Sequence, residues 1–268
     1  MKDILEITDK EAEHLAWIHS NKFITPDLFF KKFLKHQSSR NAYYILNKYA
    51  DPEKGFLDVE QSSVTTSSYF FLTAKALKSL DEQNRMLVRS SRYPVRVNLK
   101  EKEHDLKVQE VRVAIEASEN LKDVFWVTDF ELRSGITPSI KAAFLEGRLD
   151  KQDWRLNGFN PNPKGRRTPD GYFEADLEGE REAFTLEFEN QAYNEQKVNR
   201  MTGYLKDYYP SATKLVVSAT RKNAVRMIGA LQKKVKSEDQ HQWFVSDLEK
   251  VTTSQFKKIW HQIDHPIS

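Results

Sequence analysis

Acidic residues are concentrated in two neighbouring segments of the chain, one on each side of Gly179. Both segments alternate polar and apolar residues, a pattern typical of β-strands, whose successive side chains point to opposite faces. Glu187 and Glu189 therefore share a face, roughly 6.5 to 7 Å apart at about 3.3 Å per residue. If the strands form an antiparallel hairpin with matched apolar faces, Asp170 lies opposite Glu187 or Glu189. The pattern predicts three carboxylates at one end of a small sheet.

Clustered carboxylates repel one another, so a cation usually lies among them. Oxygen-only ligands select a hard ion, and we therefore predict a Mg²⁺ or Mn²⁺ site formed by Asp170, Glu187 and Glu189. A hairpin with a hydrated acidic face produces the same alternation and is the alternative interpretation.

The composition of the whole chain limits the other possibilities. Of its 268 residues, 39% are hydrophobic and 30% are charged, which is typical of a folded soluble protein. The absence of cysteine excludes disulfides and thiolate zinc sites, and it fits a cytoplasmic location. We expect no membrane partner, because no apolar run is long enough to span a bilayer, and no signal peptide, because the chain does not open with one at Met1-Lys2-Asp3. The chain has no phosphate-binding loop of the G-x-x-x-x-G-K-[ST] type, so ATP use is not expected.

Residues 1–80 predict the order helix, helix, helix, hairpin, helix. Thr25 and Pro26 are typical of a helix start, and Ser38 or Ser39 is the expected cap of the third helix. This order is that of a winged helix-turn-helix, whose third helix would enter the major groove of DNA. The candidate DNA-binding residues on that helix are Arg40, Asn41, Tyr44 and Lys48. A protein-interaction module with the same elements is the alternative.

A basic linker is predicted over residues 81–103, and a second domain over 104–268. The expected elements of this domain are a helix at 105–120, a strand at 124–127, an irregular segment at 135–167, the acidic hairpin, a helix from Asn190 to about Tyr209, a strand at 214–219, a helix at 222–236, a strand at 243–245 and a closing helix through 256–263. Alternating strands and helices favour an α/β core. The helix at 222–236 is basic, since Arg221, Lys222, Arg226, Lys233, Lys234 and Lys236 occur with no acid among them.

The helix that follows the acidic hairpin carries two stripes at helical spacing. The expected buried stripe is Val198, Met201, Leu205 and Tyr208, and the polar one is Tyr193, Lys197, Arg200 and Tyr204. Because this helix leaves the strand of the paired glutamates, Lys197 or Arg200 would be able to bind a scissile phosphate. Arg166 and Arg167 end the irregular segment and are expected to approach the same site and its DNA. An ordinary amphipathic surface is the alternative for each residue.

Two motifs resemble those of known nucleases. Pro169-Asp170, followed after sixteen residues by Glu187-Phe188-Glu189, resembles the PD-(D/E)xK signature of restriction-endonuclease-like enzymes, with Glu189 where most members carry lysine. The order of the winged-helix pattern, His104-Asp105-Leu106 and these motifs resembles the plasmid replication-relaxation family, which includes the MobC-class conjugative relaxases. The resemblance implies an α+β or α/β fold, in which an N-terminal winged helix-turn-helix precedes a restriction-endonuclease-like mixed-sheet domain.

The resemblance also implies an enzyme, a metal-dependent DNA relaxase or nickase acting at a plasmid or mobile-element origin. Asp170, Glu187 and Glu189 would then be the metal-binding and catalytic carboxylates. Lys197 and His104 are further catalytic candidates, and Glu110 is a weaker one. The implied partners are origin DNA and other relaxosome or replication proteins. The rival hypothesis is a non-catalytic winged-helix DNA-binding regulator of replication or transcription with a degenerate nuclease-like domain.

Overall fold

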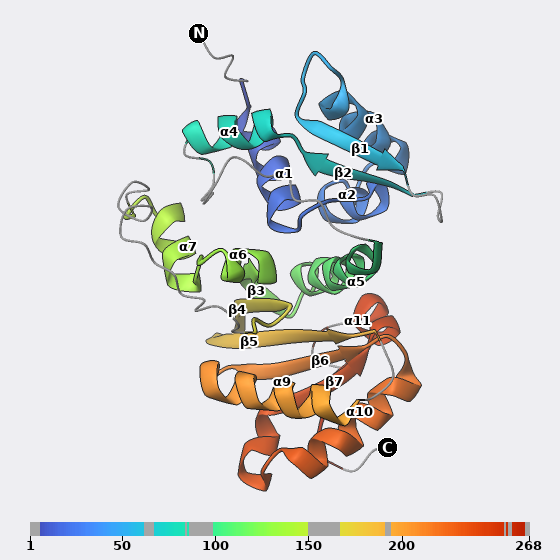
Figure 1. Cartoon of the computed structure of the whole chain (residues 1–268), viewed down its shortest axis with the longest axis vertical. Helices are drawn as coiled ribbons and strands as arrows, with labels where there is room; N and C mark the ends of the chain where they lie inside the picture. The colour runs from blue at the N-terminus through green and yellow to red at the C-terminus, as the bar shows by residue number, and fades with distance from the viewer. Residues whose placement is uncertain are drawn as a thin grey trace. The chain divides into compact units, whose positions relative to one another are not determined.

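The computed structural model describes residues 6–61, 67–83, 85, 99–149, 167–190, 194–254, 256 and 259–265. The chain divides into two compact units (Figure 1), the first formed by residues 1–102 and 134–161 and the second by residues 103–133 and 162–268. Arg166, Tyr193 and most of the predicted basic linker lie outside the described residues.

The first unit has the predicted order of helices and strands. It contains α1 (Asp9–Ser20), α2 (Pro26–Phe33), α3 (Ser39–Ala50), β1 (Leu57–Gln61), β2 (Ser68–Leu72) and α4 (Ala74–Glu82). The expected caps are confirmed, because the side chains of Thr25 and Ser38 accept hydrogen bonds from backbone N–H groups in the first turns of α2 and α3. β1 and β2 pair antiparallel, and Ile24 forms an isolated bridge to Phe70 of β2.

The segment from 135 to 167, predicted as irregular, contains helix α7 (Pro138–Leu145). Thr137 caps it and Pro138 occupies the first turn, where a missing N–H costs nothing. Ile136 is buried against Ile140 and Phe144, which fixes the helix in a small apolar cluster of the first unit.

The second unit is built on a six-stranded mixed sheet. In spatial order, the strands are β3 (Leu121–Thr128), β4 (Gly171–Leu177), β5 (Glu180–Glu189), β6 (Thr213–Ser218), β7 (Trp243–Asp247) and β8 (His261–Gln262). β3, β4 and β5 form an antiparallel meander, β5, β6 and β7 run parallel, and β8 returns antiparallel to β7. The molecule is therefore of mixed α and β class with a separate antiparallel hairpin in its first unit.

The acidic hairpin is confirmed with its predicted register. Phe173 pairs with Phe184 and Gly171 with Leu186, so apolar residues face apolar residues across β4 and β5. The turn between the strands consists of Glu178 and Gly179, both with positive φ. Two consecutive left-handed residues give the twist that a tight antiparallel hairpin requires.

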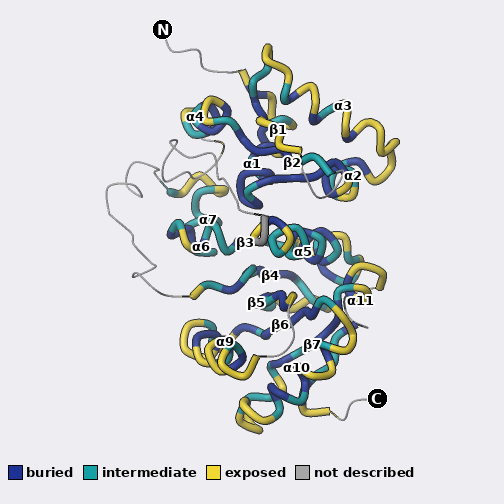
Figure 2. Tube along the Cα trace, turned by 45° about the vertical axis from the view of Figure 1, so that its right-hand side comes forward, coloured by how far each residue is buried: buried dark blue, intermediate teal, exposed yellow. Residues whose placement is uncertain are grey.

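Helices cover both faces of the sheet (Figure 2). On one face, Val111 of α5 (Leu99–Glu116) packs with Phe173, Leu186 and Val217. On the other face, α9 (Glu195–Tyr208) and α10 (Arg221–Lys234) bury residues such as Leu205 against the parallel strands. The two short helices of this unit are α6 (Asp129–Arg133) and α11 (Leu248–Thr253), and η1 (Ser237–Gln242) is a 3₁₀ turn. The glutamates of β5 therefore lie on the face that α9 covers.

Several predicted boundaries in this unit are wrong. α9 is capped by Asn194 and not by Asn190. Its buried tyrosine is Tyr204, only 8% exposed, whereas Tyr208 is 46% exposed. α5 starts at Leu99, within the predicted linker, and residues 261–262 form strand β8 in place of the predicted closing helix. None of the helices in the described part of the chain combines the length and apolarity that a membrane crossing requires.

Candidate active site

Asp170 precedes β4 directly, and its two carboxylate oxygens have different partners. Oδ1 lies 3.0 Å from Nε2 of His104, and Oδ2 accepts a 2.8 Å hydrogen bond from the backbone N–H of Phe188. Because Gly171 pairs with Leu186, the antiparallel register brings Asp170 opposite Glu187. The Pro-Asp and Glu-x-Glu motifs therefore meet at one end of the hairpin.

Glu187 is half-buried on the next strand, and the hydroxyl of Tyr204 in α9 donates a hydrogen bond to it. Loss of hydration raises the pKa of Glu187 well above its ordinary value, and the negative charges of Asp170 and Glu189 add to that effect. Arg167 and Lys197 act in the opposite direction. Burial and the neighbouring carboxylates therefore disfavour the ionised form of Glu187 relative to a glutamate in water.

Glu189, at the end of β5, is only 6% exposed. Its carboxylate forms an ion pair with the ammonium group of Lys197 in α9. Lys197 and Tyr204 are two turns apart on the same helix, so one face of α9 contacts both glutamates. The polar stripe predicted on this helix thus lies against the carboxylates at two of its positions.

His104 comes from α5 and contacts the site from the other face of the sheet. Its ring lies 5.8 Å from that of Phe188. Burial lowers the pKa of the imidazole, but the hydrogen bond and charge of Asp170 outweigh burial and raise the pKa above its ordinary value. A protonated His104 would form an ion pair with Asp170.

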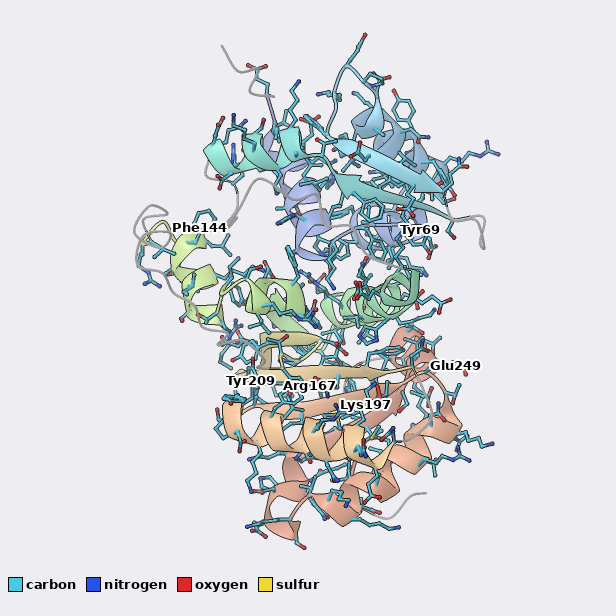
Figure 3. All side chains as sticks on the ribbon, in the orientation of Figure 1. Tyr69, Phe144, Arg167, Lys197, Tyr209 and Glu249 are labelled. Atoms are coloured by element: carbon cyan, nitrogen blue, oxygen red, sulfur yellow. The ribbon has the colours of Figure 1, made fainter. Side chains whose placement is uncertain are left out.

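Arg167 and Tyr209 interact with Glu187 through charge, and Tyr172 lies beside Tyr209. Arg167 is exposed and lowers the pKa of Glu187 through its charge. Burial and the charge of Glu187 raise the pKa of Tyr209 to about 12. The Tyr209 ring lies 5.9 Å from that of Tyr172. Figure 3 labels Arg167, Lys197 and Tyr209 beside β5 and α9. The sequence placed Tyr204 on the polar stripe with Lys197 but gave it no role in the site, and Tyr172 and Tyr209 were not among the predicted site residues.

The donor set fits a hard metal ion, since Asp170, Glu187 and Glu189 offer only oxygen ligands. Across the residues described, no group of three or more His, Asp and Glu side chains has its ligand atoms positioned for a metal. Two of the carboxylates instead interact with Lys197 and Tyr204.

Other predicted residues lie elsewhere. Arg200 is exposed and donates to the backbone carbonyl of Gln196. Glu110 pairs with Lys107 on α5. In the first unit, Arg40, Asn41, Tyr44 and Lys48 are all exposed on α3, on the side opposite its buried residues, and Tyr44 is 70% exposed. Neither Arg40 nor Lys48 forms a salt bridge with any residue in the described ranges.

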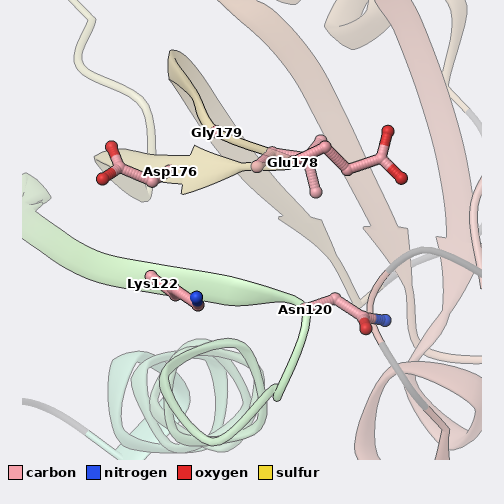
Figure 4. A pocket seen from close by; sticks show the side chains of 6 residues that line it. Asn120, Lys122, Asp176, Glu178 and Gly179 are labelled. Atoms are coloured by element: carbon pink, nitrogen blue, oxygen red, sulfur yellow. The ribbon is translucent and has the colours of Figure 1, made fainter.

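A pocket of about 340 Å³ lies at the opposite end of the hairpin (Figure 4). Asn120, Lys122, Asp176, Leu177, Glu178 and Gly179 line it. Asp176 lies six positions after Asp170 along β4, roughly 20 Å away at about 3.3 Å per residue. The pocket is therefore separate from the carboxylates.

The fold and site define a mixed α and β protein whose six-stranded sheet gathers carboxylates beneath a helix. Comparison with family models, curated proteins and solved structures found no match for this chain.

Proposed function

We propose that this protein is a metal-dependent DNA nickase in which Asp170, Glu187 and Glu189 hold a Mg²⁺ or Mn²⁺ ion. The observation that carries the proposal is the hairpin register that brings Asp170 opposite Glu187, whose pKa is raised, with Glu189 two residues further along the same strand. Dehydration and like charge both disfavour the ionised form of Glu187, and a divalent cation would offset both effects. When bound, such an ion would stabilise the charge that develops on the phosphate and on the leaving oxygen.

The protein's own side chains would position the substrate and the carboxylates. Lys197 is the cation paired with Glu189, so it supplies the positive charge that a lysine at position 189 would have provided. In the substrate complex it would bind a non-bridging oxygen of the scissile phosphate. His104 and the Phe188 N–H group would hold Asp170 in one orientation.

Target selection would belong to the first unit. The exposed face of α3 carries arginine, asparagine and lysine, the side chains that most often contact base edges and phosphates in the major groove. The sequence patterns and the motif resemblance add four parts to the proposal. The first unit would be a winged helix, and its target would be a plasmid or mobile-element origin. The partners would be relaxosome or replication proteins, and the location would be cytoplasmic.

The test is nicking of a supercoiled plasmid that carries the DNA flanking this protein's own gene, in Mg²⁺ or Mn²⁺. Glu187→Ala should abolish nicking and leave DNA affinity nearly unchanged. Loss of DNA binding with nicking retained would contradict the division of roles between the two units.

A second candidate is a non-catalytic DNA-binding regulator. The observation that favours it is that Lys197 and Tyr204 already interact with Glu189 and Glu187, so protein groups stabilise these carboxylates without a metal. Carboxylate-dependent uptake of Mn²⁺ distinguishes the two candidates, because only the nickase requires it.

A further inference from the structure

Helix α10 starts at the end of the sheet where β5, the strand of the glutamates, and β6 terminate. β5 and β6 are parallel, and Glu189 pairs with Ser218 where both strands end. The backbone N–H of Ala219 donates a 2.9 Å hydrogen bond to the carbonyl of Glu189. α10 begins two residues later, at Arg221. The first turn of α10 therefore lies beside the end of β5 (Figure 1).

The charges on this first turn oppose the helix dipole. Arg221 and Lys222 place positive charge where the dipole is already positive, although acidic residues are the favourable choice there. α10 contains no acidic residue that would balance them. An anion bound at this end of the helix would relieve the repulsion and would also meet free backbone N–H groups.

The basic side chains continue along the exposed face of α10. Lys222, Arg226 and Lys233 lie on the side opposite buried Leu231. Lys233 lies eleven positions after Lys222, about 16 Å at 1.5 Å per residue. A Cβ added at Gly229, which lies in the same stripe, would meet no atom within 4 Å, so the stripe is open.

Most of these cations have no counter-ion within the described ranges of the chain. Among the residues with described positions, Lys222 and Arg226 form no ion pair, and Lys233 contributes only a through-space attraction to Glu195. Lys234 and Lys236 differ, because they pair with Glu195 at 2.6 Å and with Glu238 at 3.7 Å. The uncompensated charge therefore lies on the outer stripe and on the first turn.

We propose that Arg221, Lys222, Arg226 and Lys233 bind the sugar-phosphate backbone of duplex DNA as it leaves the carboxylate site. Duplex DNA carries one negative charge per about 1.7 Å of its axis, so a stripe of about 16 Å meets several phosphates. That the bound DNA leaves a cleavage site rests on the proposed nickase function. DNA binding by α10 does not require that function. The surface reads no base sequence, because phosphate contacts position DNA without specifying it.

The experiment compares two full-length double variants that lose equal charge on the same part of the chain. Lys222→Gln/Arg226→Gln removes two unpaired cations, and Lys234→Gln/Lys236→Gln removes two paired ones. Affinity for a fluorescent duplex of arbitrary sequence is measured in EDTA between about 50 and 200 mM salt. The first variant should bind more weakly, and its salt slope should fall by about 1 for each lost phosphate contact. The control should retain the wild-type slope, and Lys222→Arg/Arg226→Lys should retain most of the affinity.

A wild-type slope and affinity in Lys222→Gln/Arg226→Gln would overturn the proposal. An equal loss in the control would also overturn it, because net charge alone would then explain the effect. A third contrary result is unchanged duplex binding with reduced binding to phosphatidylserine vesicles, which would assign the stripe to a lipid surface. Because binding is measured in EDTA, without a divalent metal, it does not depend on nicking, so failure of the nickase proposal and failure of this one give different results.

Discussion

The carboxylate of Asp170 accepts a hydrogen bond from the backbone N–H of Phe188, the residue between Glu187 and Glu189. This contact joins the Pro-Asp motif to the Glu-x-Glu motif through a main-chain group that does not depend on side-chain rotamers. The position of Asp170 relative to both glutamates is therefore set by the hairpin itself.

This contact predicts different results for two substitutions of Asp170. Asp170→Asn keeps an oxygen that can accept from Phe188 but removes the charge, so the melting temperature should change little while nicking is lost. Asp170→Ala also leaves the Phe188 N–H without its partner, which costs about 1–3 kcal/mol when such a group is buried. Nicking assays and thermal unfolding of both variants check this. Full activity of Asp170→Asn would exclude its carboxylate as a metal ligand.

Lys197 should be required for cleavage. Removing a charged donor that stabilises a transition state typically lowers kcat about 10²–10³-fold, and we expect a loss of that size for Lys197→Met. Lys197→Arg keeps the charge and should retain part of the rate. Arg200→Met is the matched control, because Arg200 is one turn away on α9 and exposed. Equal losses in Lys197→Met and Arg200→Met would point to general attraction of DNA.

Stability should depend on pH through Glu187. Its pKa is raised in the folded chain, so the stability that this group contributes is complete below the ordinary pKa of 4.5 and is lost as the pH rises through the folded pKa. Glu187→Gln does not ionise and should avoid that loss. In EDTA, the free energy of unfolding of the variant relative to wild type should therefore rise above pH 4.5, by at most about 1.4 kcal/mol per pH unit. A difference in the free energy of unfolding that stays constant with pH would contradict a raised pKa for Glu187.

Gly171, the residue after Asp170, should tolerate no side chain. A Cβ at this position would lie 2.4 Å from Cζ2 of Trp126, whose ring stacks on Phe173 at 4.8 Å. Gly171→Ala should destabilise the protein by about 1–3 kcal/mol through overpacking. Gly229→Ala is the control, and it should stabilise helix α10 by about 0.5–1 kcal/mol because the site is open. Urea unfolding measures both changes, and an unperturbed Gly171→Ala would show that Trp126 moves freely.

Local patterns were sufficient to predict the acidic hairpin and the order of helices and strands from α1 to α4. The two-residue alternation of β4 and β5 allows only registers that match Phe173 with an apolar partner, and the structure has such a register. Helix α7 was missed because the prolines and glycines of residues 135–167 favour irregular structure, although Thr137-Pro138 has the same start signal as Thr25-Pro26.

Residue spacing in the sequence could not predict contacts between segments that are far apart in the chain. His104 and Asp170 are 66 residues apart, and their contact depends on how α5 packs on the sheet. The same limit explains the error on α9, where an apolar pattern favoured Tyr208 as the buried residue. Tyr204 is buried instead, because its hydroxyl finds a carboxylate partner in Glu187 on the strand beneath.

Calorimetric titration of Mn²⁺ tests the central claim most directly, with the wild-type chain compared with Glu187→Gln at the same pH. We predict saturable uptake by the wild type and a loss of at least about tenfold in affinity, or about 1.4 kcal/mol, in the variant. Equal uptake by both chains, or none by the wild type, would contradict a metal site at these carboxylates.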